Sequence, residues 1–165
     1  MDGYGILPVP IRYYEENDKD QVRKFHCSNH KPKWHLQPQK LIRRAPFHLD
    51  DSLIEILVAH DGPDVVGVAV FEVTDVPSCF VLSLGVKRQR QNQGIGASLK
   101  RAVVVVAADR GLIVESHVHH QNSYMRLINK GLGAATEPLE DDPDYLATVV
   151  RGEVAQNEED VTPSK

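Results

Sequence analysis

The sequence contains little cysteine and no long apolar run. Its two cysteines, Cys27 and Cys79, are too few for a disulfide framework, and we expect both to be reduced and buried. No apolar run approaches the roughly 20 residues that span a bilayer. The first residues also lack the basic start and apolar core of a secretory signal. These absences argue against a disulfide scaffold and a membrane-spanning helix, and they predict a cytoplasmic protein.

The chain also lacks an excess of positive charge. Its formal net charge is -4, so no global field draws its whole surface to nucleic acid. Its 165 residues match one ordinary domain, which we expect to cover residues 1–154. Residues 155–165 are charged and polar and show no apolar period, which predicts a disordered tail.

Apolar spacing divides the remaining sequence into strands and helices. A turn signal at residues 61–64 joins two strand-like runs into a hairpin, and the next run, residues 79–86, is apolar enough to be buried on both faces. Strands are predicted over residues 6–14 (at a sheet edge), 54–62, 65–73, 79–86, 112–119 and from Tyr145, and helices from Asp18 or Asp20 toward Cys27, after Gly96 and over Ser123–Lys130, with an irregular region over residues 28–49 that includes a candidate short helix at 39–44.

The segment after Gly96 carries conflicting signals. Ile95, Leu99 and Val103 fall at helical spacing, with Lys100 elsewhere on the helical wheel. The four valines of residues 103–106 favour a strand by propensity. The segment is longer than a normal strand and is followed by Gly111, a natural helix stop. We therefore predict a helix.

A basic, glycine-containing loop joins the buried strand to this helix. Residues 86–99 read VKRQRQNQGIGASL. Unpaired amides at a helix N-terminus attract anions, and glycine allows close approach to the backbone. Lys87, Arg88 and Arg90 add positive charge beside the loop. The arrangement predicts a pyrophosphate site, whereas a simple strand-to-helix turn with solvated charges is the alternative.

The glycine spacing excludes two common phosphate-binding loops. A P-loop needs a Lys-Ser/Thr pair after its second glycine, and the sequence continues instead as Ala97-Ser98. A dinucleotide-binding loop needs three glycines directly after the strand and an acidic residue about 20 positions further on. Neither pattern is present.

The pattern Gln91-x-x-Gly94-x-Gly96 resembles the loop of the GNAT superfamily of N-acetyltransferases. The flanking order is also similar to that family, with Asn122 at the start of a helix that ends at Gly133. The resemblance covers roughly residues 54–150. It implies an α/β (α+β) domain with a mixed, mainly antiparallel central sheet flanked by helices, and acetyl-CoA as the acetyl donor.

The resemblance also implies a set of cofactor-binding positions. The backbone of a strand end that splays from its neighbour would pair with the pantetheine arm, loop amides would hold the pyrophosphate, and an Asn would contact the arm. In this chain the strand positions are Leu84, Gly85 and Val86, the loop positions are Gln91, Asn92, Gln93, Gly94, Ile95, Gly96, Ala97 and Ser98, and the Asn is Asn122.

The chemistry implied is attack of a neutral amine on the thioester, with a backbone amide such as that of Val86 polarising the carbonyl. At the proton donor the sequence departs from the family, because the usual Tyr position is occupied by Asn129. The candidate catalytic residues are Glu115, Tyr124 and Glu72, with His117 sharing a strand face with Glu115.

The acceptor is left open as a primary amine of a small molecule, peptide or protein. One alternative is a toxin-like enzyme that acetylates charged tRNA, for which Lys40, Arg43 and Arg44 would supply RNA contacts. Another is a non-catalytic acetyl-CoA-binding module, suggested by Asn129. Trp34 either walls an acceptor cleft or fills the core. We expect no metal site, and an exposed sheet edge would permit a homodimer.

Overall fold

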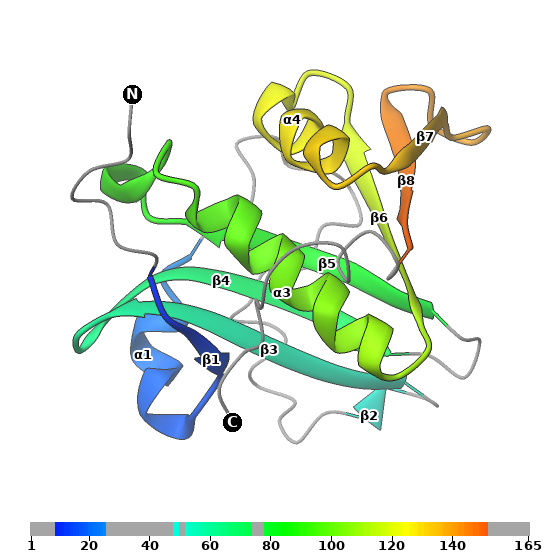
Figure 1. The fold of residues 1–165 in the computed structure, drawn as a ribbon. Helices are drawn as coiled ribbons and strands as arrows, with labels where there is room; N and C mark the ends of the chain where they lie inside the picture. The colour runs from blue at the N-terminus through cyan, green and yellow to red at the C-terminus, as the bar shows by residue number, and fades with distance from the viewer. Residues whose placement is uncertain (1–8, 26–47, 50–51, 74–77, 152–165) are drawn as a thin grey trace.

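A computed structural model describes residues 9–25, 48–49, 52–73 and 78–151. Its centre is an eight-stranded sheet in the order β1-β3-β4-β5-β6-β8-β7, with β2 also paired to β3 (Figure 1). The strands are β1 Ile11–Tyr13, β2 His48–Leu49, β3 Ser52–Asp61, β4 Asp64–Val73, β5 Ser78–Val86, β6 Ile113–His119, β7 Ala135–Pro138 and β8 Tyr145–Val150, and the helices are η1 Glu16–Asp18, α1 Lys19–Val22, η2 Arg88–Arg90, α3 Ile95–Asp109 and α4 Ser123–Gly131.

The strand pairing confirms the predicted fold class. β5 and β6 pair in parallel, and the other paired strands run antiparallel. The predicted hairpin is formed by β3 and β4. Within the described residues, β1 covers Ile11–Tyr13 of the strand predicted over residues 6–14, and it lies at the sheet edge as predicted.

Apolar side chains cover both faces of the sheet. Leu99 and Val103 of α3 pack with Phe71 of β4 on one face. Val22 of α1 packs with Val68 of β4 on the other face. Figure 1 shows α3 crossing the middle strands and α4 lying beside β6, β8 and β7. A strand covered on both faces needs apolar residues throughout, which explains the continuous apolar run of β4.

The predicted long helix is confirmed as α3, although four consecutive valines lie within it. Val103 and Val104 are fully buried, so packing outweighs their preference for strands. The backbone of Gly111, just beyond the helix, has φ +71°, which is the left-handed conformation expected at a helix stop.

The predicted N-terminal helix is shorter than expected. α1 ends at Val22, so Phe25 lies beyond it, and neither Asp18 nor Asp20 caps it through a side chain. The Asp18 carboxylate instead accepts hydrogen bonds from the Arg12 guanidinium at 2.7 and 2.9 Å. Cys27, the 39–44 helix and the C-terminal tail lie outside the described residues.

Two strands were not predicted. β7 lies between the predicted Ser123–Lys130 helix and the strand predicted from Tyr145, and its four residues are all exposed. It pairs with β8 and so becomes the outer strand on that side. β2 lies at the end of the region expected to be irregular, and it pairs with β3.

A polar cluster lies inside the core beneath α3. Lys100 is fully buried, which is contrary to its predicted place off the apolar face. Its ammonium Nζ lies 2.8 Å from the Ser116 hydroxyl of β6, which hydrogen-bonds the Thr148 hydroxyl of β8. Burial lowers the pKa of Lys100 from 10.5 to about 8 because the charged form loses its hydration.

This buried amine sets a pH dependence of stability. Because the folded pKa lies below the unfolded one, the unfolded chain binds more protons between pH 8 and 10.5, so stability rises with pH in that window. Below pH 8 the lysine is charged in both the folded and the unfolded chain, so the full free-energy cost of burying the ammonium applies. We expect Lys100→Met to stabilise the fold at pH 7 by up to about 3 kcal/mol, and we expect this gain to shrink as pH rises toward 10.5.

The measurement is urea unfolding of both proteins at several pH values. Lys19→Met is the matched control, because that lysine is more than one-third exposed. A gain for Lys100→Met that did not change with pH would contradict the pKa assignment.

Candidate active site

β5 and β6 separate part-way along their length. They pair only from Ser78 opposite Ile113 to Phe80 opposite Glu115. Beyond that point β5 continues to Val86, held on its other side by β4. Among the described residues, the β6-facing edge from Val81 to Val86 therefore has no strand partner. The predicted positions Leu84, Gly85 and Val86 all lie on this open edge.

The predicted anion-binding loop follows directly after β5. After η2 the chain turns at Asn92 and Gly94, which have φ of +64° and +81°. Gly94 is the N-cap of α3 and supplies no capping side chain. The first intrahelical hydrogen bond of the backbone runs from the Ser98 amide to the Gly94 carbonyl, at 3.0 Å. The backbone amides of residues 95–97 therefore lie before the first hydrogen bond of the helix and have no partner within it.

Side chains of the loop hold its shape. The Gln91 amide nitrogen donates to the Val86 carbonyl at 3.2 Å, which returns the loop onto the end of β5. Arg90 donates to the Gln93 side chain at 3.0 Å and forms a 2.7 Å ion pair with Asp61 in the β3–β4 turn. Arg90 therefore braces the loop, and its charge is already paired.

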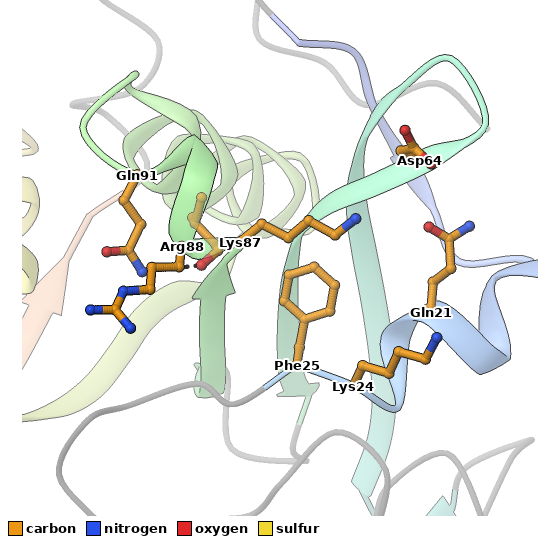
Figure 2. Close-up of a pocket in the computed structure, with 8 residues that line it drawn as sticks. Gln21, Lys24, Phe25, Asp64, Lys87, Arg88 and Gln91 are labelled. Carbon is orange, nitrogen blue, oxygen red and sulfur yellow. Dashed lines mark hydrogen bonds between the residues drawn. The ribbon is translucent and has the colours of Figure 1, made fainter.

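A cavity of about 900 Å³ lies beside the loop. In Figure 2 the Lys87 side chain extends from the end of β5 over Phe25 toward Gln21. The lining residues are Gln21, Lys24, Phe25, Asp64, Val86, Lys87, Arg88 and Gln91. Three of them are cationic and one is acidic, so the cavity suits an anionic ligand.

Tyr124, a predicted catalytic residue, packs against the glycine loop. A Cβ at Gly96 would collide with its hydroxyl oxygen and lie 3.1 Å from the ring carbon Cζ. The hydroxyl is buried and makes no aligned hydrogen bond to a described residue. Burial raises the pKa of Tyr124, and the nearby Gly96 amide opposes this rise. The absence of a side chain at Gly96 makes room for the tyrosine.

The other catalytic candidates lie on one face of the sheet. Glu72 of β4 and Glu115 of β6 flank Phe80 in register, about 10 Å apart at the usual strand spacing. His117 shares the face of Glu115 and contacts the Phe80 ring at a centroid distance of 4.9 Å. Burial lowers the pKa of His117, and the Glu115 carboxylate opposes this shift. Glu115 and His117 thus border the point where the strands separate.

The two asparagines of α4 have different surroundings. Asn122 caps the helix, because its side-chain oxygen accepts from the Met125 amide at 3.2 Å. Asn129 is 2% exposed, and neither polar atom of its side chain bonds to a described residue. The helix therefore begins as predicted. A neutral amide stands where the family resemblance placed a tyrosine.

Comparison with known proteins identifies the family. A family model for the acetyltransferase (GNAT) family matches residues 17–133. The chain belongs to the GNAT family. A search of curated proteins gives no match.

Solved structures agree with this GNAT assignment at the level of the fold. A chimeric spermidine N-acetyltransferase built partly from Vibrio cholerae is 12% identical with a TM-score of 0.68, covering 90% of this chain and 100% of that chain. A ribosomal-protein alanine N-acetyltransferase from Escherichia coli is 13% identical with a TM-score of 0.65, covering 85% and 91%. A Bacillus subtilis acetyltransferase in complex with CoA is 16% identical with a TM-score of 0.62, covering 87% and 98%.

Other parts of the structure offer less to the site. The described residues contain no group of three or more His, Cys, Asp or Glu side chains arranged to hold a metal ion. Within the same residues no helix has the length and apolarity to cross a membrane. Cys79 is buried, as expected, and burial raises the pKa of its thiol to about 12, so it is a poor nucleophile at neutral pH.

The contact between Tyr124 and Gly96 gives a direct test of the site geometry. Gly96→Ala should destabilise the fold by about 1–3 kcal/mol, because the new methyl group overpacks against the ring. Tyr124→Phe removes the nearest atom and leaves no hydroxyl buried. The double variant should therefore recover part of the loss, as measured by chemical unfolding in a double-mutant cycle. Strictly additive effects would show that the two residues do not touch.

Proposed function

We propose that this GNAT protein transfers the acetyl group of acetyl-CoA to a primary amine of a small molecule, peptide or protein by direct attack. The observation that carries the proposal is the open edge of β5, which leads directly into the uncapped N-terminus of α3. An extended amide-bearing arm can pair with such an edge as an added strand. Amides at the helix start can hold phosphate oxygens.

The described residues offer contacts for two parts of acetyl-CoA, the pantetheine arm and the pyrophosphate. Leu84, Gly85 and Val86 would pair with the pantetheine arm, while the amides from Gln91 to Ser98 would surround the pyrophosphate. Lys87 and Arg88 line the adjacent cavity and would attract the phosphates. Asn122 would contact the arm from the start of α4 through its amide nitrogen, because its oxygen already caps the helix.

The amine would approach from the sheet face that carries Glu115 and His117. A carboxylate there attracts the ammonium form of the acceptor and can take its extra proton, which a neutral imidazole can pass on to solvent. Burial favours the neutral form of His117. We assign the base to Glu115 with His117 as its relay, and we place Glu72 further from the separation point. Tyr124 lies against the loop, so its hydroxyl would contact the cofactor rather than the amine.

Thermal unfolding with and without acetyl-CoA tests the cofactor site. Ligand at 100 times its dissociation constant should stabilise the protein by about 2.7 kcal/mol. Gly94→Glu should abolish this shift, because a carboxylate would repel the pyrophosphate. Gly111→Glu is the matched control, since that glycine has a similar positive φ of +71° and a side chain there also meets open space. No shift at millimolar acetyl-CoA would overturn the proposal.

Release of CoA in the presence of an amine panel tests the transfer itself. The panel should include spermidine, an alanine-terminated peptide and a lysine-containing peptide. We expect Glu115→Gln to lower kcat/KM by roughly 100-fold and Glu72→Gln to have a smaller effect. Equal effects of both variants would contradict the assignment of the base. Binding of acetyl-CoA without turnover of any amine would favour a non-catalytic module.

A further inference from the structure

Two carboxylates and an aromatic ring lie in one row across the middle of the sheet. Glu72 of β4 lies opposite Phe80 of β5, and Phe80 lies beside Glu115 of β6. Side chains in register point to the same face, so the ring lies between the two carboxylates. The row continues with Ile54 of β3 on one side and Val149 of β8 on the other. Its two charged groups are therefore separated by an aromatic ring and bounded by apolar side chains.

This row is accessible from outside the sheet. Glu72, Phe80 and Glu115 are each only partly buried, whereas Ile54 beside them is 3% exposed. The row also reaches the point where β5 and β6 separate, because Phe80 and Glu115 are the last pair between those strands. A molecule lying along the row would therefore have its Glu115 end at the open edge of β5.

No cation of the described strands β4–β8 balances the two carboxylates. These five strands contain no lysine or arginine. Within the described part of the chain, neither Glu72 nor Glu115 forms an ion pair. Burial lowers the pKa of the neighbouring His117, which favours its neutral form. This face of the sheet therefore suits a ligand that brings its own positive charge.

The spacing of the two carboxylates fits a linear diamine. Two strand spacings separate Glu72 from Glu115, which is about 10 Å. An extended chain of seven methylene groups also holds its two terminal nitrogens about 10 Å apart at ordinary bond lengths and angles. Its methylene groups would lie against the Phe80 ring and lose apolar surface to it. A monoamine could engage only one end of the row.

We propose that the acetyl acceptor is a linear diamine that spans this row, with its reacting amine at Glu115 and its second ammonium at Glu72. This inference rests on the proposed function. The reacting ammonium gives one proton to Glu115, and its nitrogen then bonds to the acetyl carbon while the C–S bond breaks and its electron pair leaves with sulfur. The second proton lost by the nitrogen passes through solvent to that sulfur. Acetylation removes one of the two positive charges, so the product binds the row less tightly than the substrate.

Matched pairs of amines test this acceptor class in the CoA-release assay. One pair is 1,7-diaminoheptane and heptylamine, and the other is 1,3-diaminopropane and propylamine. In the native protein, kcat/KM should be roughly 5- to 10-fold higher for 1,7-diaminoheptane than for heptylamine, after division by two for its two equivalent amines. The short diamine cannot reach both carboxylates, so we expect it to have little advantage over propylamine.

Two matched glutamine variants locate the second ammonium. Glu72→Gln should raise KM for 1,7-diaminoheptane by roughly 5- to 10-fold with little change in kcat, because Glu115 still receives the reacting amine. Glu137→Gln is the control. Glu137 faces the same side from β7, two strands beyond β6, but Ala147 rather than an aromatic ring lies between it and His117. This variant should keep the native preference. A retained thermal shift with acetyl-CoA shows that each variant is folded.

Several outcomes would overturn this acceptor class while the proposed function stands. They are equal kcat/KM of the native protein for 1,7-diaminoheptane and heptylamine, an unchanged KM for the diamine in Glu72→Gln, loss of the preference in Glu137→Gln, and turnover of peptides but of neither diamine. If the native protein bound no acetyl-CoA, or released no CoA with any amine, the proposed function itself would fail.

Discussion

The site depends on one constraint, which is that β5 and β6 pair over only three positions. Two parallel strands that stayed in register would satisfy each other's backbone groups and leave nothing for a ligand. Here β4 holds β5 rigidly along its other edge, so the strand remains extended after β6 has left. The open edge of β5 is therefore a pre-formed set of backbone donors and acceptors. The protein backbone needs no further ordering when an extended ligand pairs with it.

In the proposed reaction, the same separation would let one strand serve both reactants. Successive residues of β6 point to opposite faces, so Glu115 and His117 lie on one side and Ser116 on the other. The face toward α3 carries the glycine loop and Lys100. The opposite face carries carboxylates that suit a cationic amine. In the proposed reaction, the acetyl donor and the amine would therefore meet at the gap between β5 and β6 without sharing a binding surface.

Sequence could predict those parts of the fold where local signals agree. The turn signal at residues 61–64 predicted the hairpin, the apolar run of β5 predicted the buried strand, and the glycines around α3 predicted the loop. β7 gave no signal, because its exposed residues lack alternation and it is held only by pairing with β8. Glu72, Phe80 and Glu115 form one row only through strand register, which spacing along the chain cannot supply.

Lys100 shows where sequence reasoning ignored an available signal. The residues three, four and seven positions further along, Val103, Val104 and Ala107, are all apolar and buried, which already places residue 100 on the inner face of α3. A lysine within such a stripe lowers stability, and an apolar residue would pack there at less cost. Its amine donates to the Ser116 hydroxyl, which in turn bonds to the Thr148 hydroxyl, so a small polar cluster holds the amine in the interior. Lys100 also lies beside the point where β5 and β6 separate, and local conflicts of this kind are often retained near functional sites at a cost in stability.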